Sequence, residues 1–188
     1  MHTLVGIPKE DGSNRLIAVM PTLLRVWSRA RQPLAAQWEE DHPALEFWGG
    51  VGKSSTQAAF ELQADREVAT LQGGAAMDIF FDLWKCYEMV VGDTLLQEAS
   101  ATEFPARLCI MAILCYQLPR ALLVMGSFSA LVEAFQGILA GCSLAPTLLR
   151  VILLRASRST QLCYPRVKLR VLLDDAALSW TTSKGKST

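Results

Sequence analysis

The chain has 188 residues, of which 51% are hydrophobic and 19% are charged, and its formal net charge is zero at pH 7. This length and apolar content are sufficient for a buried core and exclude an intrinsically disordered chain. The lack of a basic excess disfavours independent, high-affinity binding to nucleic acid, because such binding neutralises phosphates with Lys and Arg.

In the first part of the chain, turn residues and helical spacing alternate. Residues 3–20 predict a short β-hairpin that turns at Asp11-Gly12. Glycines and prolines between residues 42 and 55 predict a loop. Two helices flank this loop. We expect them to run from Pro21 to about Glu40, and from the capping residues Ser54-Ser55-Thr56 to Gly73-Gly74.

The rest of the chain mixes strands and helices, which predicts an α+β fold. Helices are expected over residues 85–99, from Phe104 to before Pro119, and over 144–157. Strands are expected over residues 75–83, twice within 122–135 around Gly126-Ser127, and over 162–173 and 176–180.

The cysteines and the longest apolar run constrain the environment of the chain. The five cysteines form no C-x-x-C pair and only two histidines occur, so no zinc-ligand spacing is present. An odd number of cysteines without a signal peptide predicts free, buried thiols in a reducing, intracellular compartment. The apolar run over residues 108–116 is too short to cross a membrane and predicts a buried helix.

Acidic residues follow two of the predicted strands, each of which reads as buried. Asp82 follows the apolar residues 79–81, and Asp174-Asp175 follow residues 171–173. Carboxylates next to a core are costly unless they are paired. Three of them converging from two adjacent strands would form an oxygen-rich site for a hard cation such as Mg²⁺. Two such ions can stabilise the attacking and leaving oxygens of an in-line phosphoryl transfer.

Simpler interpretations of these acids remain open at this point. Asp82 could cap the N-terminus of a following helix. Asp174-Asp175 could occupy an ordinary hairpin turn, where Asp is favoured. Asp78 is a second candidate ligand, because strand alternation places it on the same face as Asp82.

Five blocks of the sequence form an ordered set of motifs. They are Ile7-Pro8-Lys9-Glu10-Asp11-Gly12-Ser13-Asn14-Arg15-Leu16-Ile17, Gly49-Gly50-Val51-Gly52-Lys53-Ser54-Ser55, Asp82-Leu83-Trp84-Lys85-Cys86-Tyr87-Glu88, residues 137–146, and Leu172-Leu173-Asp174-Asp175. In this order they resemble the blocks of reverse transcriptases from non-LTR retrotransposons and group II introns. The resemblance runs from about residue 5 to about residue 180.

This resemblance implies an RNA-directed DNA polymerase domain with the right-hand architecture of that family. Residues 1–72 would form a fingers-like region, and residues 73–188 a palm whose antiparallel sheet packs on helices. Because the chain ends soon after Asp175, the end of the palm and the thumb are expected to be missing. The implied reaction adds deoxynucleotides to a primer 3′-hydroxyl and releases pyrophosphate. The implied partners are an RNA template, a DNA primer and dNTPs, with no membrane.

The resemblance also implies a role for individual residues. Asp82, Asp174 and Asp175 would be catalytic and, with the backbone carbonyl of Leu83, would hold two Mg²⁺ ions, with Mn²⁺ as an alternative. The remaining assignments concern substrates. Lys9, Arg15, Tyr87 and Gly141 would contact the nucleotide, with Tyr87 as the steric gate against a 2′-hydroxyl, and Lys53 would contact template or primer.

Two departures from the family pattern leave alternatives open. Leu172 stands where an aromatic residue is usual, and Ala140 stands where glutamine usually precedes Gly141. A catalytically inactive remnant with the same fold is therefore the second interpretation. A P-loop NTPase, suggested by Gly52-Lys53-Ser54, is disfavoured because Phe47 occupies the position of the first P-loop glycine.

Overall fold

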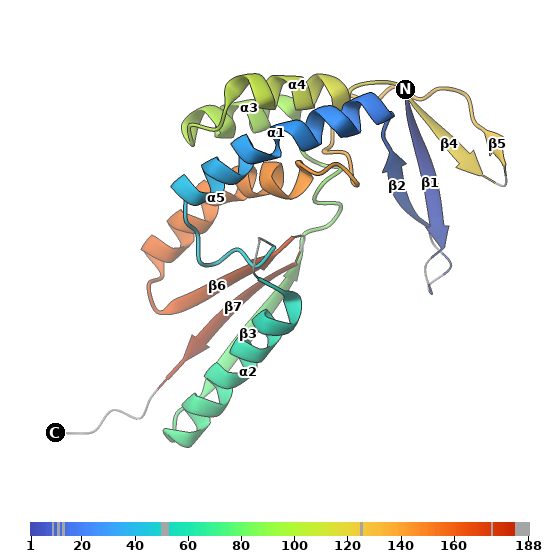
Figure 1. Ribbon diagram of the computed structural model, residues 1–188. Coiled ribbons are helices and arrows are strands. Elements are labelled where there is room, and N and C mark those ends of the chain that lie inside the picture. The colour runs from blue at the N-terminus through green and yellow to red at the C-terminus, as the bar shows by residue number, and fades with distance from the viewer. Residues whose placement is uncertain are drawn as a thin grey trace. The chain divides into compact units, whose positions relative to one another are not determined.

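Five helices and two β-sheets make up the described part of the chain (Figure 1). The computed structural model describes residues 1–182 apart from 9, 11, 13, 50–52, 125 and 174, with the backbone alone for Asn14 and Arg15. These residues form two compact units. Unit 1 comprises Met1–Pro43 and Lys85–Ile152, and unit 2 comprises Ala44–Trp84 and Leu153–Thr188.

Unit 1 contains a four-stranded sheet with the order β2-β1-β4-β5. Its strands are β1 (His2–Pro8), β2 (Asn14–Val19), β4 (Arg120–Val124) and β5 (Ser127–Phe128). The predicted hairpin is confirmed, since β1 and β2 pair antiparallel, although Asp11 of its turn lies outside the described residues. The parallel pairing of β1 with β4 joins segments that are far apart in the sequence, and no local pattern predicts it.

Helices form the core of unit 1. They are α1 (Thr22–Asp41), α3 (Gly92–Ala101), α4 (Ala106–Tyr116) and the first turns of α5 (Ala145–Cys163). Leu95, Leu144 and Leu148 are almost fully buried among them. The Trp38 indole Nε1 donates a hydrogen bond of 2.7 Å to the Thr102 carbonyl, which joins α1 to the end of α3. Within the described residues, no helix is both long and apolar enough to span a membrane.

Two helix boundaries differ from those expected. Residues 84–89 form turns and α3 begins only at Gly92, so the predicted helix start at residue 85 was wrong. Lys85 has φ of +47°, a left-handed conformation that cannot continue a right-handed helix. At the other boundary, α5 continues to Cys163, because Leu154 and Ser157 extend its buried face. The strand expected from residue 162 therefore begins at Val167.

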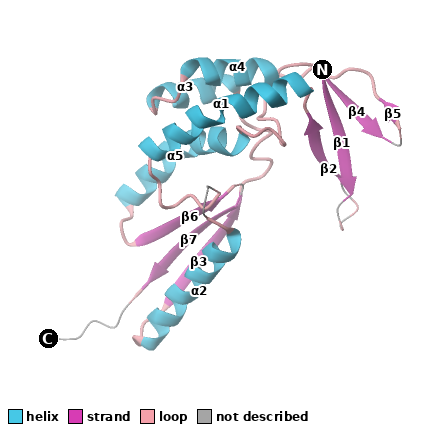
Figure 2. Ribbon diagram, in the orientation of Figure 1, coloured by secondary structure: helices cyan, strands magenta, loops and turns pink. Residues whose placement is uncertain are grey.

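Unit 2 contains an antiparallel sheet with the order β3-β7-β6, drawn in magenta in Figure 2. Its strands are β3 (Ala76–Asp82), β7 (Asp175–Thr181) and β6 (Val167–Leu172). Helix α2 (Ser55–Leu71) precedes β3, and the Ser54 hydroxyl caps it by accepting a hydrogen bond from Gln57 N–H, as the sequence predicts.

The expectation that β3 is a buried core strand was wrong. Phe80 is 64% exposed and Phe81 is 45% exposed, although both belong to the apolar run before Asp82. The physical reason is lack of cover: Phe80 and Phe81 point to opposite faces of this edge strand, which pairs only with β7 among the described strands, and both remain exposed. An apolar run of this length thus does not distinguish an edge strand from a central one.

The cysteines differ in burial. All five are free thiols, and Cys109, Cys115 and Cys142 are buried as expected. Cys86 is half-buried and Cys163 is exposed, which corrects the prediction that all the thiols are buried. Burial raises the pKa of Cys109 to about 11, so this thiol stays protonated and unreactive at neutral pH.

Candidate active site

Asp82 and Asp175 face each other across two neighbouring strands of unit 2. Asp82 is the last residue of β3, Asp175 is the first residue of β7, and the antiparallel register pairs them directly. Directly opposite residues project to the same face of a sheet, with Cβ atoms about 4.5–5.5 Å apart. Both residues are exposed. Neither carboxylate has a hydrogen bond or ion pair with any described residue.

Asp82 is not a helix cap, because turns rather than a helix follow it and α3 has Val91 as its N-cap. Its carboxylate is therefore available for another role. Two like charges placed directly opposite each other destabilise a sheet unless a cation compensates them. Carboxylate oxygens are the ligands that Mg²⁺ prefers, so the donor set fits a hard divalent cation.

Asp78 lies on the same face of β3 but has a different environment. The Arg66 guanidinium of α2 donates to its carboxylate, and the Asp78 side chain is only 3% exposed. Its charge is thus already compensated within the fold. Asp78 thus has a structural partner, whereas Asp82, on the same face of β3, has none among the described residues.

Asp174 lies outside the described residues. Its chain neighbours are described. Leu172 pairs with Asp175 across the hairpin, and Leu173 adopts a left-handed φ of +56°. Leu83, whose carbonyl is the remaining predicted metal ligand, is half-buried directly after Asp82.

The segment before α2 reaches the hairpin that carries these acids, which the sequence did not predict. Trp48 N–H donates to the Val171 carbonyl at 2.8 Å, and Val171 N–H donates to the Glu46 carbonyl at 2.7 Å. A Cβ added at Gly49 would lie 3.1 Å from the Leu173 side chain. Glycine at residue 49 therefore allows close packing against the turn that precedes Asp175.

Lys53 has a local role in the structure. Its ammonium donates to the Phe47 carbonyl at 2.6 Å and to the Leu45 carbonyl at 3.3 Å. It also lies 5.4 Å from the centre of the Trp48 ring, within cation–π range. Lys53 thus stabilises the loop before α2, while Gly52, on which the P-loop interpretation depended, lies outside the described residues.

In unit 1, the segment around Gly141 packs against β2. Ala18 N–H donates to the Ala140 carbonyl at 3.2 Å, and a Cβ at Gly141 would lie 2.9 Å from the Ala18 carbonyl oxygen. Gly141 also has φ of +100°, so only glycine fits this position without strain. Arg15 lies on β2, but its side chain and the whole of Lys9 are outside the described residues.

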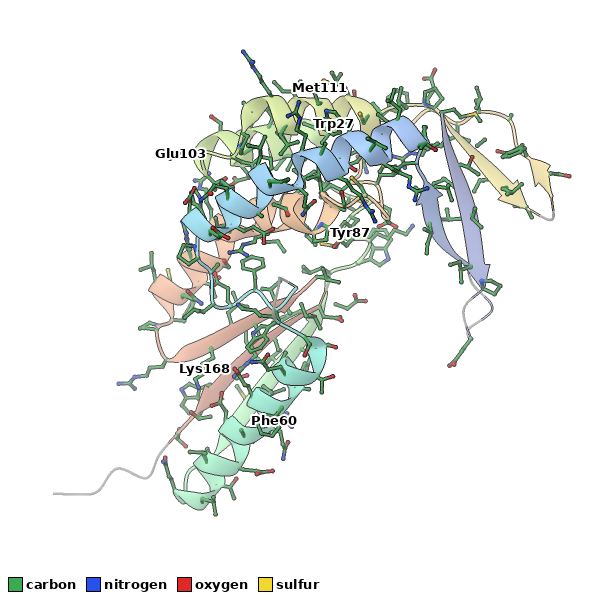
Figure 3. All side chains as sticks on the ribbon, viewed as in Figure 1. Trp27, Phe60, Tyr87, Glu103, Met111 and Lys168 are labelled. Atoms are coloured by element: carbon green, nitrogen blue, oxygen red, sulfur yellow. The ribbon has the colours of Figure 1, made fainter. Side chains whose placement is uncertain are left out.

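Backbone hydrogen bonds join the turn of Tyr87 to the same segment. Ile138 N–H donates to the Tyr87 carbonyl at 2.7 Å, and Gly137 N–H donates to the Val90 carbonyl at 2.8 Å. Tyr87 is half-buried and is labelled in Figure 3. Unit 1 therefore brings together β2, Gly141 and Tyr87, while Asp82 and Asp175 belong to unit 2.

Comparison with known families gives one match over most of the chain. Residues 7–186 match the family model described as reverse transcriptase (RNA-dependent DNA polymerase). No curated protein matches the chain.

Solved structures of telomerases share the fold. The apo telomerase of Candida tropicalis truncated from the C-terminal domain is 16% identical with a TM-score of 0.65, over 98% of this chain and 44% of that one. The Candida albicans telomerase in complex with a TWJ fragment of telomeric RNA is 14% identical with a TM-score of 0.59, over 99% of this chain and 38% of that one. The chain thus spans less than half the length of these proteins.

Proposed function

The chain belongs to the reverse transcriptase (RNA-dependent DNA polymerase) family, and from this premise we propose that it carries the catalytic acids of an RNA-directed DNA polymerase. The reaction would transfer a deoxynucleotide to the 3′-hydroxyl of a DNA primer on an RNA template. The observation that carries the proposal is the register pair of Asp82 and Asp175. These exposed carboxylates face each other without a compensating cation from the residues that the structure describes.

Asp82, Asp174 and Asp175 would hold two Mg²⁺ ions, with the Leu83 carbonyl as a further oxygen ligand. When bound, such ions neutralise charge on the transferring phosphoryl group and lower the barrier to in-line displacement. The chain contributes the geometry. The β3–β7 pairing fixes Asp82 opposite Asp175, and the Arg66–Asp78 ion pair anchors α2 to the same strand.

Residues of unit 1 would bind the incoming nucleotide. Lys9 and Arg15 would neutralise its phosphates, because positive side chains stabilise charge that develops during transfer. Close packing at Gly141 would let the backbone approach the nucleotide or template. The ring of Tyr87 would exclude a 2′-hydroxyl, and its main chain is held by Ile138.

The fingers–palm architecture is part of the same proposal. It assigns residues 1–72 to a fingers-like region and residues 73–188 to the palm. In its support, the β1–β2 hairpin falls within the first range, and the three strands of the acid-bearing sheet fall within the second. Lys53 would contact template or primer, provided that it leaves the loop carbonyls it binds in the structure.

Incorporation of labelled dNTPs tests the proposal. A protein containing this chain would be given an RNA template, a DNA primer and Mg²⁺, and compared with its Asp82→Asn variant. The matched control is Asp93→Asn, which removes an exposed carboxylate in the first turn of α3. We expect Asp82→Asn to lose incorporation and the control variant to keep it. Equal activity of wild type and Asp82→Asn would refute the proposal.

A non-catalytic domain with the same fold is the second candidate. The observation that favours it is Ala140, which offers its carbonyl to Ala18 and has no side-chain amide to contact a nucleotide or template. Such a domain would bind Mg²⁺ at the acids but incorporate no nucleotide. The incorporation assay separates the two candidates, and calorimetric titration with Mg²⁺ checks the metal binding that both require.

A further inference from the structure

A cleft of about 610 Å³ in unit 2 is lined by β6, by α2 and by the segment before α2. Residues 167–170 of β6 form one side of it, and Glu46, Trp48 and Glu61 contribute to the rest of its lining. This volume lies in the range of about 300–1,000 Å³ that is usual for ligand sites. The cleft involves none of the acids or nucleotide-binding residues assigned above.

The edge of β6 at this cleft has unpaired backbone groups. Val171 uses its N–H and C=O to pair with Glu46 and Trp48, so these groups point away from β7. Backbone groups alternate sides along a strand, and those of Leu169 therefore point to the same open edge. Over the described ranges, no partner meets them. One donor and one acceptor are thus available to a further strand.

The lining of the cleft carries carboxylates without cations. Glu46 is only 4% exposed, and its carboxylate accepts a hydrogen bond of 2.7 Å from the neutral Ser157 hydroxyl. Glu61 is half-buried and has no hydrogen bond or ion pair with any residue that the structure describes. By contrast, Asp65 in the same lining is bonded to Lys168, labelled in Figure 3, and to Arg170. A buried carboxylate is costly until a cation compensates it.

We propose that this cleft binds an extended basic peptide, which adds a strand to the edge of β6 and places a lysine or arginine side chain at Glu46 and Glu61. Main-chain hydrogen bonds to Leu169 provide affinity, and alternate side chains provide specificity. Trp48 and the 84% exposed Leu45 meet the apolar residues of the peptide. Three carboxylates (Glu46, Glu61 and Asp65) against two cations (Lys168 and Arg170) give the lining a formal charge of −1, which disfavours a phosphate backbone.

Fluorescence anisotropy with the 188-residue chain tests this inference. The probe is a labelled six-residue peptide of alternating lysine and valine, blocked at both ends. Glu61→Lys should weaken its binding at least about tenfold, the factor that corresponds to the loss of one charged contact. Glu67→Lys is the matched control, because it makes the same change at an exposed position of α2 outside the cleft. That variant should bind like wild type.

Two altered peptides test the strand pairing without changing the protein. Replacing lysine by glutamate should abolish binding, and so should methylation of alternate backbone nitrogens, which removes the main-chain donors. Three results would each overturn the proposal. They are no binding of the lysine peptide, equal binding of the methylated peptide, and an equal loss of peptide affinity in Glu61→Lys and Glu67→Lys. Displacement of the peptide by a single-stranded RNA oligonucleotide, with the same dependence on Glu61, would also overturn it.

Discussion

The middle and the end of the β3-β7-β6 sheet differ in how their acidic side chains are compensated. In the middle, the Asp78 side chain is buried and bound to Arg66 of α2. At the end, Asp82 and Asp175 are exposed and opposite each other, without a cation among the described residues. Asp78 and Asp82 have the same chemistry and share one face of one strand. They differ in charge compensation, because α2 provides an arginine for only one of them.

A second ion-pair network strengthens this contrast. Asp65 of α2 accepts hydrogen bonds from Lys168 at 2.8 Å and from Arg170 at 2.6 Å. Arg170 also donates to the Ser179 hydroxyl at 3.0 Å. Charges in the middle of the sheet therefore attach α2 to it. We expect substitutions in the middle to change stability and substitutions at the end to change activity.

The largest expected effect is that of Asp174→Asn on nucleotide incorporation. It removes one charge and little volume, so incorporation should fall by roughly a thousandfold or more, which corresponds to about 4 kcal/mol of transition-state stabilisation. The melting temperature should stay unchanged. The measurement is dNTP incorporation in a protein containing this chain. Activity near that of wild type would show that Asp174 is not a metal ligand.

Asp65→Ala tests the middle of the sheet. It leaves the Arg170 side chain, 10% exposed, with its hydrogen bond to the Ser179 hydroxyl but without a carboxylate among the described residues. Removing one partner of a buried ion pair costs about 3 kcal/mol of unfolding free energy. Denaturant unfolding measures this loss, with Glu67→Ala at an exposed position of α2 as the control. Equal stability of the two variants would contradict the structural role of the network.

Gly141→Ala should destabilise unit 1 by about 1–3 kcal/mol, the cost of a strained backbone conformation. The added Cβ would also lie 2.9 Å from the Ala18 carbonyl. Gly12→Ala is the matched control, because Gly12 has φ of +81° but nothing within 4 Å of an added Cβ. Both variants carry the backbone strain, and only the first also carries the steric clash. Thermal unfolding should therefore show a larger loss for Gly141→Ala.

Tyr87→Ala tests whether unit 1 selects the sugar. If the ring lies beneath the nucleotide sugar, ribonucleotides should be accepted about tenfold better relative to deoxynucleotides, a change of about 1.4 kcal/mol. If the ring is part of the core, the substitution should instead cost about 3–5 kcal/mol of stability and leave selectivity unchanged. The ratio of incorporation efficiencies and the melting temperature decide between these outcomes. Tyr164→Ala, at a 63% exposed position, is the control.

The smallest expected effect is a dependence of stability on acid pH. Burial opposes ionisation of Asp65, but hydrogen bonds from Lys168 and Arg170 outweigh it and lower its pKa. A carboxylate whose pKa is lowered in the folded state stabilises the fold at pH values above its unfolded-state pKa, about 3.9. This stabilisation is lost as the pH falls through its folded-state pKa. The unfolding free energy of wild type should thus fall more steeply below pH ~4 than that of Asp65→Asn. Parallel slopes would contradict this.

Local sequence patterns predicted most elements and the strands that end or begin at the candidate acids. The β1–β2 hairpin, the Ser54 cap of α2 and the strands before Asp82 and Asp175 follow from turn chemistry, capping and apolar runs. These signals involve residues close together in the chain, so a single sequence contains them. The ordered blocks also indicated the family, which the match over residues 7–186 confirms.

Tertiary structure decided which of these residues are compensated and which are exposed. The Arg66–Asp78 ion pair, the fit of Gly141 against Ala18, and the exposure of Phe80 on an edge strand depend on neighbours supplied by other elements. An apolar run or an Asp has the same local pattern whether a helix covers it or not. The sequence by itself thus determined where the acids stand in the chain. Packing determined that Asp78 is paired with Arg66 while Asp82 and Asp175 are exposed, without a cation among the described residues.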